Sequence, residues 1–128
     1  MRGMEAAGLK TFAATGLLWE DYNAVYNRAK IALVKSVHGD VAQRVFENMA
    51  QGCCVLADRA PDAERLGFWP GVEYAAYADS ADAVTGARCL IESGQWKDIA
   101  ERGAQAVKPH TWMARAQTLL DTIRGVSQ

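Results

Sequence analysis

The sequence predicts a doubly wound parallel α/β sheet of about four strands, with helices on both faces and a helical C-terminal tail. Two short apolar runs, 29–34 and 53–57, flank a segment of helical periodicity at 44–52 that ends in Gly52. The second run is almost continuously apolar, which is typical of a strand buried in a parallel sheet. Strands and helices that alternate in this way build one parallel sheet with crossover helices.

The same patterns place the remaining elements along the chain. Strands are expected at 9–14, 29–35, 53–57 and 72–77, and helices at 19–28, 41–51, 80–93, 95–107 and from 111 onward, with a short helix beginning at Pro61. The helix at 41–51 is the clearest, because Val41, Val45 and Met49 recur at the spacing of one helix face.

Side chains at the expected helix ends support these boundaries. Asp40 followed by Gln43 has the form of a capping box at the start of the helix 41–51. Gly52 suits the position after that helix, where a left-handed residue is common. Ser80 and Thr111 are expected to cap the two helices that they precede.

Size and composition favour one globular domain with no broad attraction to nucleic acid. The chain has 128 residues, half of them hydrophobic, and a net charge of −1. No apolar run approaches the length of a membrane span, and the N-terminus has no signal-peptide core. We therefore expect a cytoplasmic protein.

The three cysteines indicate buried, reduced thiols. Cys53 and Cys54 are adjacent in an apolar strand, and Cys89 lies in an expected helix. An odd number of cysteines without paired spacing argues against a disulfide scaffold or a zinc site. Neither histidine has partners at metal-ligand spacing, so no metal site is expected. No cofactor is expected either.

Several polar residues follow the strands at the carboxyl edge of the sheet, where folds of this class bind ligands. Arg44 and Glu47 share one helix face and are candidate ligand-binding residues; the alternative is a surface ion pair. Ser36 and His38 are candidates to contact a phosphate or a sugar; alternatively, Ser36 satisfies backbone groups and His38 has no role. Asp58 either lies at the same edge as a ligand-binding residue or stabilises a turn.

The four tryptophans are expected to serve packing. They are spread over the chain as Trp19, Trp69, Trp96 and Trp112. Packing in the core or between domains is favoured over stacking on a base. Trp69, in a turn before Pro70, is expected to be the most exposed.

The order of these segments resembles a known family. The segments 26–33, 44–52 and 55–58, and in the tail His110-Thr111-Trp112 and Arg115-Ala116, are similar in order and spacing to the donor-binding half of group 1 glycosyltransferases, nearest to the CgeB-like subgroup. The resemblance covers about 9–123. It implies the GT-B fold, in which two Rossmann-like domains face a cleft and the C-terminal one binds the nucleotide-sugar. The chain then looks partial, because it lacks the acceptor-binding domain.

The resemblance also implies roles for residues. Glu47 matches the glutamate that hydrogen-bonds the ribose hydroxyls, and a carboxylate is chemically suited to a vicinal diol. The helix-start amides near Val41 and Ala42 would face the diphosphate. A helical rise of about 10 Å from Asp40 to Glu47 would match the span from diphosphate to ribose. The turn that includes Gly16 and Leu17 matches the base-contacting turn.

The sequence departs from the family pattern just before this helix. Many members carry a second glutamate eight residues before the first, and here that position is Gly39, followed by Asp40. Asp40 would repel a diphosphate at the same helix end. Asp40 therefore either turns away when the ligand binds or caps the helix permanently.

The resemblance implies transfer of a glycosyl group from a nucleoside diphosphate sugar, by a chain that is inactive alone because the acceptor side of the cleft is missing. The expected partners are the nucleotide-sugar and an N-terminal acceptor domain or partner chain. The alternative is a non-catalytic module that binds a protein or forms a homodimer, and a dimer contact covering Glu47 and Ser36 would favour it. A receiver-like domain is disfavoured, because its acidic cluster and late lysine are not found.

Overall fold

The computed structural model describes residues 2–36 and 39–127. Within them the sheet has three strands, β1 (Ile31–Val34), β2 (Cys54–Asp58) and β3 (Ala75–Tyr77), in the order β1-β2-β3. Both pairings are parallel, with Val34 opposite Ala57 and Ala57 opposite Ala76. The expected parallel α/β architecture is confirmed.

The helices alternate with these strands and continue past them. They are α1 (Arg2–Ala6), α2 (Trp19–Arg28), α3 (Gln43–Ala50), α4 (Asp62–Arg65), α5 (Ser80–Ser93), α6 (Gln95–Ala106) and α7 (Trp112–Ser127). Along the chain, α3 connects β1 to β2, and α4 comes between β2 and β3. Parallel neighbouring strands need such crossovers, because a tight turn can join only antiparallel strands.

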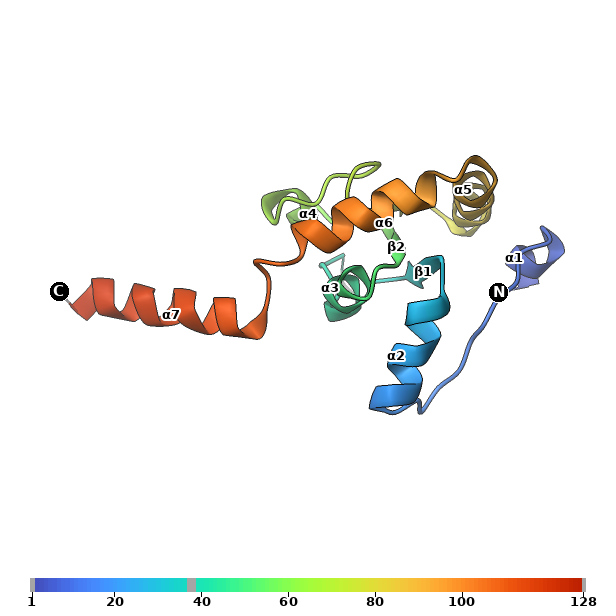
Figure 1. The fold of residues 1–128 in the computed structure, drawn as a ribbon. Coiled ribbons are helices and arrows are strands. Elements are labelled where there is room, and N and C mark those ends of the chain that lie inside the picture. The colour runs from blue at the N-terminus through green and yellow to red at the C-terminus, as the bar shows by residue number, and fades with distance from the viewer. Residues whose placement is uncertain (1, 37–38, 128) are drawn as a thin grey trace.

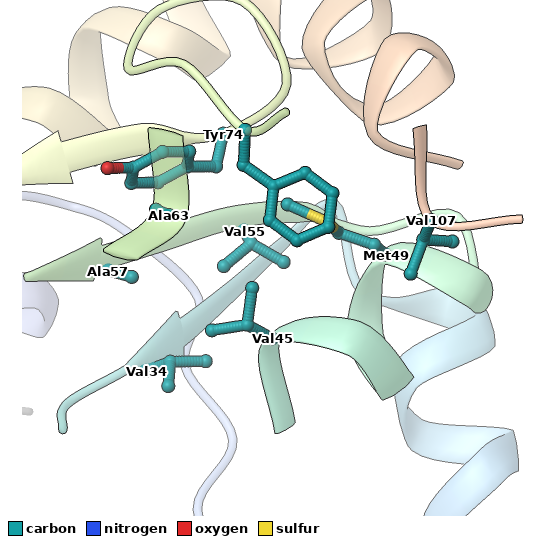
Figure 2. Packing of buried hydrophobic residues seen from close by; sticks show 9 residues of the cluster. Val34, Val45, Met49, Val55, Ala57, Ala63, Tyr74 and Val107 are labelled. Atoms are coloured by element: carbon teal, nitrogen blue, oxygen red, sulfur yellow. The ribbon is translucent and has the colours of Figure 1, made fainter. Parts of the chain in front are cut away.

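Each face of the sheet is covered by its own hydrophobic cluster. Side chains alternate between the two faces along a strand, so Val55 and Ala57 point to one side and Cys54 and Leu56 to the other. The first side packs against α3, the residues around α4 and the end of α6, with the members Val34, Val45, Met49, Val55, Ala57, Ala63, Phe68, Tyr74 and Val107 (Figure 2). The second side packs against α1, α5 and the start of α6. Helices on both faces make the sheet doubly wound.

The prediction of a strand at 9–14 is wrong. Within the described residues, this stretch pairs with no strand; it runs as an extended connection between α1 and α2 (Figure 1). Phe12 is 64% exposed, and the Thr11 hydroxyl donates to Glu5 instead of facing a neighbouring strand. A strand with no apolar face to bury gains little from joining the sheet.

The helix ends follow the sequence signals only in part. Thr111 caps α7 as expected, because its Oγ accepts from the Ala114 N–H at 3.0 Å. Gly52 follows α3 with a φ of 81°, which confirms its left-handed role. The cap of α5 is Asp79 and not Ser80: the Asp79 carboxylate accepts from the Asp82 N–H at 2.8 Å.

The last helix stands apart from the sheet. In Figure 1, α7 projects away from the other elements, and Trp112 on its first turn is 79% exposed. Trp19 and Trp112 do not pack in the core, and packing between domains, the other expectation for them, stays a prediction. The prediction that Trp69 is the most exposed tryptophan is wrong, because Trp19 and Trp112 are both more exposed. Over the described ranges, no helix combines the length and apolar character that crossing a bilayer requires.

Candidate functional site

An open groove runs between α2 and α3. Its volume is about 770 Å³. The residues that line it come from the turn before α2 and from the facing sides of both helices: Leu17, Leu18, Trp19, Tyr22, Asn23, Ala42, Gln43, Arg44, Glu47 and Gln51. Three candidates, Leu17, Arg44 and Glu47, therefore lie together in one concave surface.

Polar contacts hold α2 beside α3. The Tyr22 hydroxyl donates to Glu47 Oε2 at 3.0 Å, and the Gln51 amide donates to Asn23 at 2.6 Å. Two successive residues of α2, Tyr22 and Asn23, thus contact Glu47 on α3 and Gln51 just after it. Trp19, one turn before Tyr22 on α2, lines the same groove as Arg44 on the first turn of α3.

The carboxylate of Glu47 is half-buried, and each of its oxygens accepts a hydrogen bond. Gln43 Nε2 donates to Oε1 at 3.0 Å, and Tyr22 donates to Oε2. Burial, followed by the hydrogen bond to Glu47 and its charge, raises the pKa of Tyr22 well above its usual value. Tyr22 is thus a neutral donor at physiological pH.

Arg44 does not pair with Glu47, so the alternative of a surface ion pair is not what forms. Among the described residues, Arg44 has no ion-pair partner, and its side chain is exposed at the groove. A cation at the N-terminal end of a helix, beside free backbone N–H groups, is well suited to an anionic ligand.

A second, smaller cavity lies at the carboxyl ends of β1 and β2. Its volume is about 20 Å³, room for about one water molecule. Ser36 and Asp58 contribute to its wall and bind each other twice: the Ser36 N–H and Oγ donate to the two oxygens of Asp58, at 2.8 and 2.6 Å. Ser36 thus links two strand ends, and Asp58 bonds the end of the neighbouring strand, which is neither of the two roles expected for it.

Burial opposes the charge on Asp58, but hydrogen bonds outweigh it. Burial alone would raise the pKa of this carboxyl. The two hydrogen bonds from Ser36, together with the Asp58 backbone N–H and the charge of Lys35, hold the pKa below its ordinary value. Asp58 is therefore ionised at neutral pH.

The sequence predicts a capping box formed by Asp40 and Gln43, and the structure shows that this prediction is wrong. The helix begins at Gln43, and its N-cap is Ala42, which makes no side-chain capping bond with the described residues. Gln43 reaches forward to Glu47 instead of back to Asp40. The estimated rise from Asp40 to Glu47 is wrong for the same reason, because Asp40 and Val41 precede the helix. Both line the small cavity at the strand ends.

The remaining candidate residues lie in the turn before α2 and in the segment before α3. Gly16, with a φ of 74°, is exposed in the turn that leads to Leu17 and the groove. Gly39, with a φ of 71°, is exposed just before Asp40. His38 lies outside the described residues. The structure therefore gathers Leu17, Arg44 and Glu47 in the groove and Ser36, Asp40 and Val41 at the cavity, with Ala42 lining both.

Sequence reasoning missed the contribution of α2 to the groove. Trp19, Tyr22 and Asn23 all line it, and Trp19 is 85% exposed. A large aromatic side chain at the first turn of a weakly apolar helix was the available signal. The partner of that helix face was not visible, because Glu47 is 25 residues from Tyr22 in sequence.

The cysteines line neither the α2–α3 groove nor the small cavity. All three are free: Cys53 and Cys54 are buried as expected, whereas Cys89 is exposed and the prediction of burial is wrong for it. Burial raises the pKa of the Cys53 thiol to about 11 and that of Cys54 to about 12, so both are inert. In the described part of the chain, no group of three histidine, cysteine or acidic residues is arranged to hold a metal ion.

Comparison with known proteins supplies the family. No curated protein and no solved structure matches the chain. A family model described as glycosyl transferase-like matches residues 2–121, which include both strand ends, the groove and all three strands. The chain belongs to the glycosyl transferase-like family.

Proposed function

We propose that this chain is the donor-binding half of a GT-B glycosyltransferase of the CgeB-like kind, and that its α2–α3 groove binds a nucleoside diphosphate sugar. One observation carries the proposal. In a chain of the glycosyl transferase-like family, the carboxylate of Glu47 lies in the wall of a groove of about 770 Å³, with Arg44 and Trp19 in the same wall.

The three side chains match three parts of a nucleotide. Glu47 accepts from the ribose hydroxyls, since an ionised carboxylate is an acceptor only and can take both protons of a diol. Arg44 and the free amides at the start of α3 face the diphosphate. Trp19 stacks on the base; its exposed ring in the wall of the same groove, one turn before Tyr22, supports this role.

The same groups supply the electrostatic part of glycosyl transfer. When the bond between the sugar and the diphosphate breaks, negative charge grows on the leaving diphosphate, and Arg44 and the α3 amides stabilise it. The acceptor and its base have to be held on the other side of the donor sugar. We assign them to an acceptor domain or a partner chain, so this chain alone binds the donor and transfers nothing. The free thiols of Cys53 and Cys54 support a reducing, cytoplasmic setting.

A nucleotide titration followed by amide NMR tests the proposal. UDP and GDP are added to the wild-type chain, to Glu47→Ala and to Glu101→Ala, which removes an exposed carboxylate from α6, outside the groove. We expect shifts at Leu17, Gln43, Arg44 and Glu47 in the wild type and in Glu101→Ala, and their loss in Glu47→Ala. Binding that survives Glu47→Ala unchanged, or no binding at millimolar ligand, would contradict the proposal.

The exposed apolar face of α7 favours a second candidate, a protein-interaction or self-association module. Trp112, Met113, Leu119 and Leu120 are exposed on a helix that projects from the sheet (Figure 1). Such a surface is typical of an interaction site. Sedimentation of the wild type and of a Leu119→Ser/Leu120→Ser variant tests it: a dimer that the variant abolishes supports this candidate. A dimer that also blocks nucleotide shifts at Glu47 would favour it over donor binding.

A further inference from the structure

The two oxygens of Glu47 are held by donors from two different elements. Tyr22, on α2, donates to Oε2, and Gln43, one turn earlier on α3, donates to Oε1, both at 3.0 Å. The carboxylate is thus fixed from two directions. A glutamate on a helix surface ordinarily samples several rotamers, and two hydrogen bonds at its end select one of them.

The lone pairs of the carboxylate can be counted. An ionised carboxylate offers about four acceptor positions, two on each oxygen. Tyr22 and Gln43 take one position on each oxygen. With respect to residues 2–36 and 39–127, one position therefore remains on each oxygen, in a side chain that is half-buried and lines the groove. Two acceptors at the spacing of a single carboxylate match the two donors of a vicinal diol.

We infer that Tyr22 and Gln43 are positioning residues, which orient the carboxylate of Glu47 so that its two remaining acceptor positions recognise the 2′ and 3′ hydroxyls of a nucleotide. This inference rests on the proposed donor site and deepens it, because it assigns the preference for ribose to residues that need not touch the ligand. Preorganisation of this kind increases affinity because less freedom is lost on binding. The raised pKa of Tyr22 keeps its proton in place for this role.

Diol recognition can be separated from the rest of nucleotide binding by comparing UDP with 2′,3′-dideoxy-UDP. The ratio of their dissociation constants measures what the hydroxyls contribute. In the wild type this ratio is expected to be well above one, and in Glu47→Ala close to one. In Tyr22→Phe, which removes only the hydroxyl, we expect the ratio to fall about fivefold while the affinity for dideoxy-UDP stays the same. Gln43→Ala tests the other oxygen and should lower the ratio similarly.

Asn23→Ala is the matched control. Asn23 also joins α2 to α3, through Gln51 at 2.6 Å, but does not contact Glu47. If Tyr22 served only to dock α2, Asn23→Ala and Tyr22→Phe would change the affinities for both ligands alike and leave the ratio intact. We expect the ratio to change in Tyr22→Phe and to stay at its wild-type value in Asn23→Ala.

The outcomes distinguish this inference from the proposed function. Glu47-dependent binding of UDP with an unchanged ratio in Tyr22→Phe would overturn the positioning role and leave the donor site standing. A ratio that rises in Tyr22→Phe would overturn it too, because Tyr22 would then compete with the ribose. Failure of the wild type to bind either nucleotide would remove the donor site and the positioning role with it.

Discussion

Ser36 binds both oxygens of Asp58, and so joins the carboxyl ends of β1 and β2 at the wall of the small cavity. The two residues are 22 apart in sequence, and the pair stands where the parallel register places Val34 opposite Ala57. The serine and the aspartate, both candidates for ligand binding, are thus hydrogen-bond partners of each other. This pairing carries a prediction about acid stability.

We expect stability to fall in acid as Asp58 takes up a proton. Its folded pKa lies below the ordinary value of 3.8, so the charged form is favoured in the folded state. The stabilisation is complete above the unfolded pKa and is lost as the pH falls through the folded pKa. Urea unfolding between neutral pH and strong acid measures it. Ser36→Ala should lower the free energy of unfolding by about 2 kcal/mol at neutral pH, and Asp58→Asn should remove this part of the acid dependence. An unchanged acid dependence in Asp58→Asn would contradict the assignment.

Replacing each of two helical glycines by alanine should change the free energy of unfolding in opposite directions. A Cβ at Gly103 on α6 would lie 2.7 Å from the Glu73 carbonyl oxygen, a backbone atom that cannot move freely. We expect Gly103→Ala to lower the free energy of unfolding by about 2 kcal/mol. A Cβ at Gly86 on α5 would be 3.8 Å from a Leu56 methyl, which is an ordinary contact. Gly86→Ala should therefore raise the free energy of unfolding by about 1 kcal/mol, because alanine has the higher helix propensity. Thermal and urea unfolding of both variants check this; equal effects would contradict the close approach of α6.

One buried tyrosine, Tyr74, and one partly buried tyrosine, Tyr77, provide a matched pair for hydrogen bonding. The Tyr74 side chain is 3% exposed, and its hydroxyl has no partner among residues 2–36 and 39–127. The Tyr77 hydroxyl donates to the Val34 carbonyl at 3.0 Å. Tyr74→Phe should be neutral or stabilise by about 1 kcal/mol, whereas Tyr77→Phe should cost about 1 kcal/mol. The comparison is made by chemical unfolding, and a loss in Tyr74→Phe equal to that in Tyr77→Phe would show that the Tyr74 hydroxyl is bonded.

Trp19 should contribute to binding a base and not to stability. Trp19→Ala is expected to lower the affinity for UDP about tenfold, which is the contribution of one stacked base. The affinity for ribose 5-phosphate and the melting temperature should stay unchanged. Trp112→Ala is the control, since Trp112 is similarly exposed but lies on α7. Calorimetric titration measures both ligands. An equal loss for UDP and ribose 5-phosphate would mean that Trp19 shapes the groove without stacking on the base.

The sequence by itself determined the elements whose signals are local. Apolar runs marked β1 and β2, helical spacing marked α3, and Gly52 and Thr111 marked helix ends, because each depends on residues a few positions apart. It also marked Glu47 as a candidate. Only the tertiary structure decided that 9–14 forms no strand, that Gln43 turns to Glu47 and not to Asp40, and that Tyr22 on α2 bonds Glu47 on α3. Those outcomes depend on contacts between residues far apart in sequence, which form when the helices pack on the sheet and which no local pattern encodes.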